Sequence, residues 1–110
     1  MTEIIDRSVL AALSESVGEE FVGELIDTFM EEAPSMFLDM KQALATGDAD
    51  GFRRAAHSLK TNANTFGAIG LAEQAKELEY RARENDLNIG NKFEALEDSY
   101  EQAIKELKSI

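Results

Sequence analysis

The 110-residue sequence has no cysteine, no tryptophan, a single proline and a single histidine. Without cysteine the chain forms no disulfide, binds no metal through thiolates and has no thiol nucleophile. The sequence also contains no run of 18 or more apolar residues, and its first residues lack the basic segment of a secretory signal peptide. We therefore expect a cytoplasmic protein that makes no membrane contact.

Basic residues are scarce as well. Lysine and arginine together number 11 against 22 aspartates and glutamates, which gives a net charge of −11. A chain of this charge is repelled by nucleic-acid phosphates and by anionic lipids. Nucleic acid is therefore not expected as a partner.

The composition predicts an all-α fold. Its length and its 44% hydrophobic content suit one domain spanning residues 1–110, and no segment shows clear strand alternation. Helices are expected at about residues 7–17, 19–46, 49–66, 71–84 and 93–107. Because the connections are short, these helices predict an antiparallel up-and-down four-helix bundle, with the short first helix as an N-terminal cap.

Several residues mark where these helices begin, end or bend. Asp6 and Asp48 are the expected N-caps of the first and third helices. Pro34 predicts a kink or a short break in the long second helix. The apolar face of that helix is expected to contain Phe21, Leu25, Phe29, Phe37, Met40 and Leu44.

The one histidine, His57, lies on the polar side of the third predicted helix. At about 100° per residue, the apolar positions of this helix form one stripe centred on Leu59, and His57 falls about 160° away from it. The stripe consists of Phe52, Ala55, Ala56, Leu59, Ala63 and Phe66. The helical neighbours of His57 are Arg53, Arg54, Lys60, Thr61 and Asn64. The pattern predicts an exposed imidazole inside a small basic cluster on an acidic protein.

Several kinds of chemistry are open to such a histidine. A neutral imidazole has a free nitrogen lone pair and can act as a nucleophile. Metal binding is disfavoured, because the close neighbours of His57 are cations. No serine-hydrolase elbow or glycine-rich phosphate loop is present. A surface histidine without a chemical role remains an alternative at this point.

The residues around His57 resemble the histidine phosphotransfer (HPt) domain family. The resemblance rests on the segment AHSLK at 56–60, followed by small residues, the segment FGA at 66–68, Leu71 and the pair at 78–79. It extends over nearly the whole chain. It implies a four-helix bundle that accepts a phosphoryl group from the aspartyl phosphate of one receiver domain and passes it to another receiver.

The resemblance also implies roles for individual residues. His57 would be the phosphoacceptor through Nε2, and Lys60, with Arg53 and Arg54 more loosely, would stabilise charge on the phosphoryl oxygens. Glu79 would hydrogen-bond Nδ1 of His57 and orient it; from sequence alone, the alternative is a solvated surface charge on the fourth helix.

Other residues of the predicted site would meet the partner. Thr61 stands where the family often has glycine or another very small residue, close to an incoming receiver. Asn64 could bond the phosphoryl group or the receiver. Four apolar residues are further docking candidates that could equally belong to the core: Leu13, Val17, Phe21 and Ile69.

The resulting hypothesis is a phosphorelay intermediary that carries phosphate and has no ATP-binding kinase domain. Its expected partners are receiver domains of response regulators or hybrid histidine kinases. It would need no cofactor of its own, with Mg²⁺ supplied through the receiver, and would be a monomer. It would be cytoplasmic, or the cytoplasmic domain of a membrane-bound hybrid kinase. The alternative is a non-catalytic helical module that binds proteins by docking alone.

Overall fold

The computed structural model describes residues 4–109, so residues 1–3 and 110 of the predicted domain lie outside the described residues. The described part contains five α-helices and no strand, as predicted. They are α1 (Arg7–Val17), α2 (Glu19–Thr46), α3 (Ala49–Thr65), α4 (Ile69–Arg83) and α5 (Lys92–Lys108). Each boundary lies close to its predicted position.

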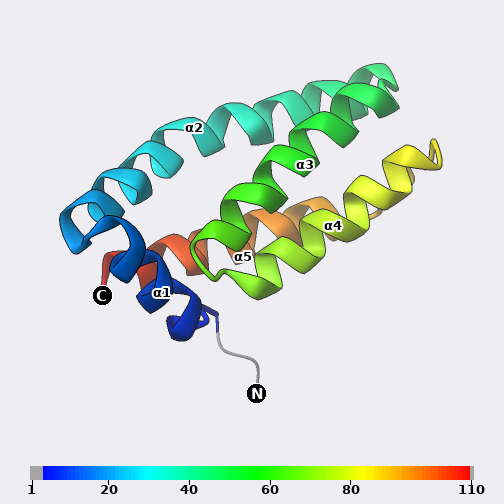
Figure 1. Cartoon of the computed structure of the whole chain (residues 1–110). Coiled ribbons are helices and arrows are strands. Elements are labelled where there is room, and N and C mark those ends of the chain that lie inside the picture. Colours follow the sequence, from blue (N-terminus) through cyan, green and yellow to red (C-terminus); the bar gives the residue numbers. More distant parts are fainter. Residues whose placement is uncertain (1–3, 110) are drawn as a thin grey trace.

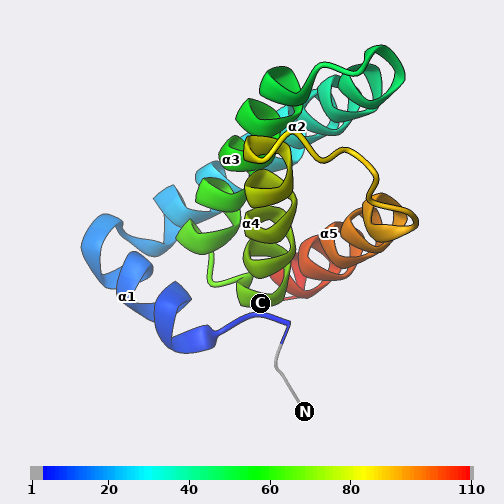
Figure 2. The same ribbon diagram turned by 90° about the vertical axis from the view of Figure 1, so that its right-hand side faces the viewer.

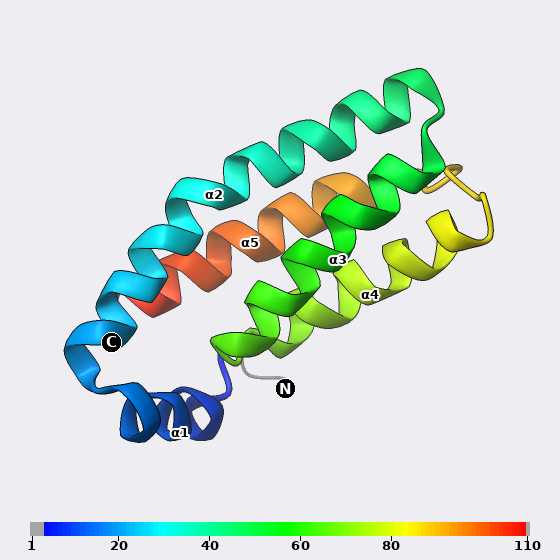
Figure 3. The same cartoon turned by 45° about the horizontal axis from the view of Figure 1, so that its top comes forward.

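The helices α2 to α5 form the bundle, and α1 lies across one end of it (Figure 1, Figure 3). Successive helices of the bundle run in opposite directions, which confirms the predicted up-and-down topology and the capping first helix. Viewed from the end, α3 and α4 lie side by side and α5 lies on the other side of α4 (Figure 2). The closest packing in the molecule is between α3 and α4. This pair of helices positions the functional site.

Both predicted N-caps are confirmed. Oδ1 of Asp6 accepts a hydrogen bond from the backbone N–H of Ser8 at 3.0 Å, and Oδ1 of Asp48 accepts one from Gly51 at 2.9 Å. These bonds satisfy backbone donors that the first turn of a helix leaves without a partner. Asp48 therefore fixes where α3 begins, nine residues before His57.

The helix α2 continues through Pro34, so the predicted break is absent. Proline removes one backbone hydrogen bond and crowds the preceding turn. Pro34 is exposed, while Phe29, Ala33 and Phe37 around it are buried in the core. Burial on both sides of the proline thus holds the two halves of α2 in one helix.

Aromatic rings fill the centre of the core. The rings of Phe29 and Phe66 stack with centroids 5.5 Å apart, and Tyr100 meets Phe29 edge-on at 5.6 Å and Phe37 at 5.2 Å. Phe21 does not join them: it is 48% exposed, so its predicted place on the core face was wrong. The neighbouring Val22 is buried instead, so the first turn of α2, which packs near α1, places Val22 and not Phe21 toward the core.

Gly67 closes the corner between α3 and α4, and we predict that Gly67→Ala destabilises the protein. Its backbone has φ +76°, and an added Cβ would lie 2.5 Å from the carbonyl oxygen of Asp6 and 3.1 Å from Cβ of Val9. The carbonyl oxygen of Gly67 also accepts a hydrogen bond from the N–H of Asp6 at 2.7 Å. The strained backbone conformation alone costs roughly 1–3 kcal/mol, and the clash with Asp6 adds to that cost. Urea unfolding measures the total loss of stability.

Gly47 provides the control for this prediction. It has a similar φ of +72°, but an added Cβ would meet nothing within 4 Å. Gly47→Ala therefore reports the cost of the backbone conformation alone. An equal loss of stability in the two variants would contradict the packing role of Gly67.

Candidate functional site

His57 lies in the middle of α3 with 56% of its side chain exposed. The six residues of the predicted stripe are all buried, so α3 places its apolar face in the core and His57 on the opposite side. Predictions of an exposed imidazole and a buried stripe are therefore both confirmed. A partner molecule can reach the ring without any change in the bundle.

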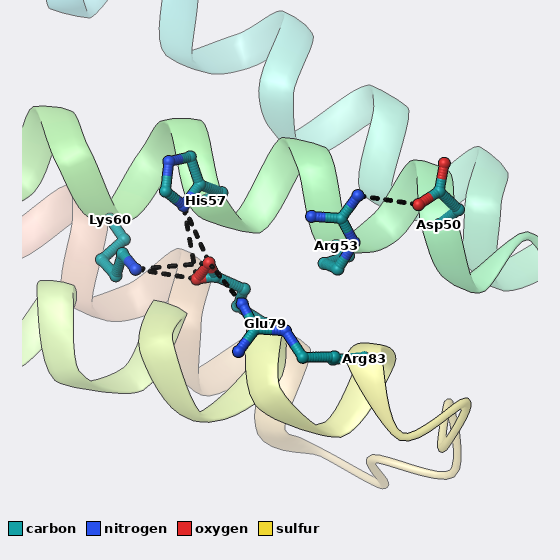
Figure 4. A network of polar contacts seen from close by, with 6 residues as sticks. All are labelled: Asp50, Arg53, His57, Lys60, Glu79 and Arg83. Carbon is teal, nitrogen blue, oxygen red and sulfur yellow. Dashed lines mark hydrogen bonds and ion pairs between the residues drawn. The ribbon is translucent and has the colours of Figure 1, made fainter.

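Glu79 of α4 is the partner of the imidazole. Its Oε1 lies 2.8 Å from Nδ1 of His57, and its side chain is only 4% exposed (Figure 4). The alternative of a solvated surface charge was thus wrong. Sequence could not decide this point, because the packing of α4 against α3 determines which face of α4 is covered.

Two cations share the same buried carboxylate. Nζ of Lys60 lies 2.8 Å from Oε2 of Glu79, and a guanidinium nitrogen of Arg83 lies 3.8 Å from Oε1. Burial acts to raise the pKa of Glu79, but hydrogen bonds from Lys60 and His57 outweigh it, so the pKa lies below its ordinary value. Glu79 is therefore ionised at neutral pH.

The charge of Glu79 determines the tautomer of His57. An ionised carboxylate only accepts hydrogen bonds, so Nδ1 of a neutral His57 carries the proton and Nε2 carries the lone pair. Figure 4 shows the second ring nitrogen on the side of the ring away from Glu79. The geometry thus places the nucleophilic Nε2 at an exposed position, while Glu79 fixes the ring through its hydrogen bond to Nδ1.

Arg53 and Arg54 do not form the open basic cluster that the helical wheel predicted. Arg53 bonds one oxygen of the Asp50 carboxylate at 2.8 Å, and Arg54 bonds the other oxygen at 2.8 Å. The wheel identified the residues that share the arc with His57, and all of them do lie on that arc of α3. It did not show that Asp50, one turn earlier, pairs with both arginines.

Thr61 and Asn64 lie one and two turns after His57, and both are exposed as predicted. Among the apolar docking candidates, Val17 is 39% exposed and Phe21 is 48% exposed, whereas Leu13 and Ile69 are partly buried. Arg83 was missed by the sequence reasoning. The sequence could have indicated Arg83, because it lies four residues after Glu79 and side chains at this spacing meet on one face of a helix.

Residues 4–109 contain no cluster of three or more histidine, aspartate or glutamate side chains that could hold a metal ion. No helix in the same range has the length and apolar character to cross a membrane.

Comparison with known proteins identifies the family of the chain. Residues 24–107 match the Hpt domain family. The phosphorelay protein LuxU of Vibrio vulnificus is 30% identical over 84 residues, which cover 76% of this chain and 73% of that protein. LuxU of Vibrio cholerae is 29% identical, covering 79% and 77% of the two chains.

A solved structure is also similar. The histidine-containing phosphotransfer protein B (HptB) of Pseudomonas aeruginosa superposes with a TM-score of 0.87 at 30% identity, covering 99% of this chain and 95% of that one. The chain belongs to the Hpt domain family. It is accordingly a phosphorelay intermediary of two-component signalling, a phosphocarrier rather than a kinase.

Proposed function

We propose that His57 accepts a phosphoryl group from the aspartyl phosphate of one receiver domain and passes it to a second receiver. One observation carries this proposal: the exposed imidazole has its Nδ1 2.8 Å from a buried carboxylate, which leaves Nε2 as the free nucleophile. A histidine that served only for docking has no need of a buried, ionised partner. An activated nucleophile needs a neighbouring group that orients it, and here the hydrogen bond to Nδ1 does so.

The transfer step balances without loss of a proton. The Nε2 lone pair attacks phosphorus, the bond from phosphorus to the aspartyl oxygen breaks, and its electron pair leaves with the receiver carboxylate. The Nδ1 proton stays on the ring, which becomes a phosphorylated imidazolium facing the Glu79 carboxylate at 2.8 Å. Glu79 thus stabilises the positive ring in the intermediate, and transfer to the second receiver reverses these steps.

Lys60 is proposed to stabilise the phosphoryl oxygens during transfer, and we expect Lys60→Ala to slow transfer about ten-fold. Its side chain is 23% exposed, lies one turn from His57, and donates from Nζ to Glu79. Preorganised cations lower the energy of a phosphoryl transition state. The rate is measured from transfer reactions that are stopped at successive times. Circular dichroism is expected to show unchanged helicity.

A large loss of helicity in Lys60→Ala would contradict the placement of Lys60 at the site. Lys105→Ala is the matched control, because Lys105 is an exposed lysine of α5, a helix that packs against α2 and α4. We expect it to transfer at the wild-type rate. A similar slowing in both variants would mean that overall charge, and not the position of Lys60, determines the rate.

The proposed partners are receiver domains of response regulators or hybrid histidine kinases. Hpt domains interact with receivers, and the exposed side chains of Arg54, Thr61 and Asn64, with the partly exposed Arg53, form the surface around His57 that a receiver would meet. Val17 and Phe21 are proposed to extend this docking surface. We further propose that the protein acts as a cytoplasmic monomer, and that Mg²⁺ enters with the receiver.

The test is transfer from a radiolabelled phosphoreceiver to the full chain. We expect label that is stable in base and labile in acid, as phosphohistidine is, and that moves on to a second, unlabelled receiver. The rival function, a docking module, predicts receiver binding without label. Binding of several receivers with no label on the chain would therefore contradict the proposed function.

A further inference from the structure

Asp50 occupies a distinctive position in the first turn of α3, seven residues before His57. Its exposed carboxylate binds a guanidinium with each oxygen, Arg53 at 2.8 Å and Arg54 at 2.8 Å. The hydrogen bond from Arg53, followed by the charge of Arg54, lowers the pKa of Asp50 below its ordinary value. Asp50 is thus charged, and both arginines are occupied.

Arg53 lies on α3 between Asp50 and His57 (Figure 4). It is four residues before His57, so the two side chains leave the helix on the same face with Cβ atoms about 5–6 Å apart. The long arginine side chain can therefore reach either Asp50 or a group attached to His57. In the structure it bonds Asp50.

Four cations at the site form ion pairs in the unphosphorylated protein. Lys60 and Arg83 lie beside Glu79, and Arg53 and Arg54 bond Asp50. The ion pairs of Glu79 and those of Asp50 differ in strength. Glu79 is buried, whereas Asp50 is 60% exposed and its ion pairs belong to the weak, solvent-screened kind.

We propose that Asp50 is a positioning residue that holds Arg53 away from His57 until His57 is phosphorylated. A phosphoryl group carries up to two negative charges and accepts paired hydrogen bonds from arginine, so it competes successfully with one exposed carboxylate. Arg53 then moves from Asp50 to the phosphoryl oxygens. This inference rests on the proposed phosphorylation of His57 and assigns Asp50 a role in setting how long the phosphoryl group stays there.

Asp50→Asn is expected to lengthen the half-life of phosphorylated His57 and to shift the transfer equilibrium toward it. The expected change is about two- to five-fold, the range that the strength of an exposed ion pair allows. The experiment labels the full chain from a phosphoreceiver, removes the receiver and follows the loss of label. Asp50→Glu keeps the carboxylate and is expected to behave like the wild type.

A double-mutant cycle separates this role from a merely structural one. In an Arg53→Gln background, Asp50→Asn is expected to have no further effect on the half-life, because the arginine that it releases is gone. In an Arg54→Gln background its effect is expected to persist. Asp98→Asn on α5 removes an equal charge from an exposed site and is expected to leave the half-life unchanged.

Three results would overturn the inference. They are an unchanged half-life in Asp50→Asn, an equal change in Asp98→Asn, or an effect of Asp50→Asn that survives in Arg53→Gln. Each of these leaves the proposed function intact, because the wild-type chain still takes up label. Failure of the wild type to take up label would instead refute the proposed function, and with it the role of Asp50.

Discussion

His57→Gln is expected to accept no phosphoryl group from any phosphoreceiver, with base-stable label at background level. His57 is the only histidine in the sequence, and the chain has no cysteine to serve as a substitute nucleophile. Glutamine can keep a hydrogen bond near Glu79, but its amide nitrogen has no basic lone pair to attack phosphorus. The measurement is labelling by a radiolabelled receiver.

The loss in His57→Gln should leave the fold intact. The side chain of His57 is 56% exposed, so the substitution removes no core contact. We expect unchanged helicity and a loss of stability of no more than about 1 kcal/mol, because the glutamine amide can still donate a hydrogen bond to the buried Glu79 carboxylate. Label that persists in a folded His57→Gln variant would place the acceptor elsewhere and contradict the site described above.

Glu79→Leu is expected to slow transfer to His57 about 100-fold, a loss comparable to that from removing the side chain that orients a metal-binding histidine. Leucine has no acceptor for the Nδ1 proton, so the ring can rotate and the Nε2–H tautomer becomes accessible. It also leaves Lys60 without its carboxylate. The rate of transfer from a phosphoreceiver measures the effect.

Glu79→Gln is the matched variant, because the amide oxygen can still accept from Nδ1 while the negative charge is lost. We expect a rate between those of the wild type and Glu79→Leu. Equal rates in Glu79→Leu and the wild type would show that Glu79 does not orient His57.

The pH dependence of stability provides an independent check on Glu79. Its pKa is lowered in the folded protein, so its ionised form stabilises the fold fully above the ordinary glutamate pKa. That contribution is lost as pH falls from the ordinary value through the lowered one. The difference in unfolding free energy between the wild type and Glu79→Gln should therefore shrink over this acidic range.

Much of the fold could be predicted from sequence because local signals agreed with one another. The cap residues Asp6 and Asp48 both form their bonds, and the stripe centred on Leu59 is buried. The break predicted at Pro34 is absent, because the local cost of proline is outweighed by the burial of Phe29 and Phe37 on either side, which is a property of tertiary packing.

The sequence predicted most of the residues of the site, but only some of the hydrogen bonds and ion pairs between them. A helical wheel places Arg53 near His57, yet it does not show which neighbour an exposed arginine bonds; here that neighbour is Asp50. Glu79 was identified by family resemblance, and its burial follows from the contact between α3 and α4. Which side chains pair across two helices depends on how each helix is rotated about its axis and how deeply it is packed in the bundle. The periodicity of one helix does not predict either.

The ring nitrogen that carries the phosphoryl group tests the central claim most directly. Nuclear magnetic resonance of the chain labelled with ¹⁵N and phosphorylated by a receiver identifies this nitrogen through its coupling to ³¹P. Because Glu79 holds the Nδ1 proton, we predict phosphorylation at Nε2 of His57, with Nδ1 still protonated. Phosphorus on Nδ1, or a phosphorylated residue other than His57, would contradict the account.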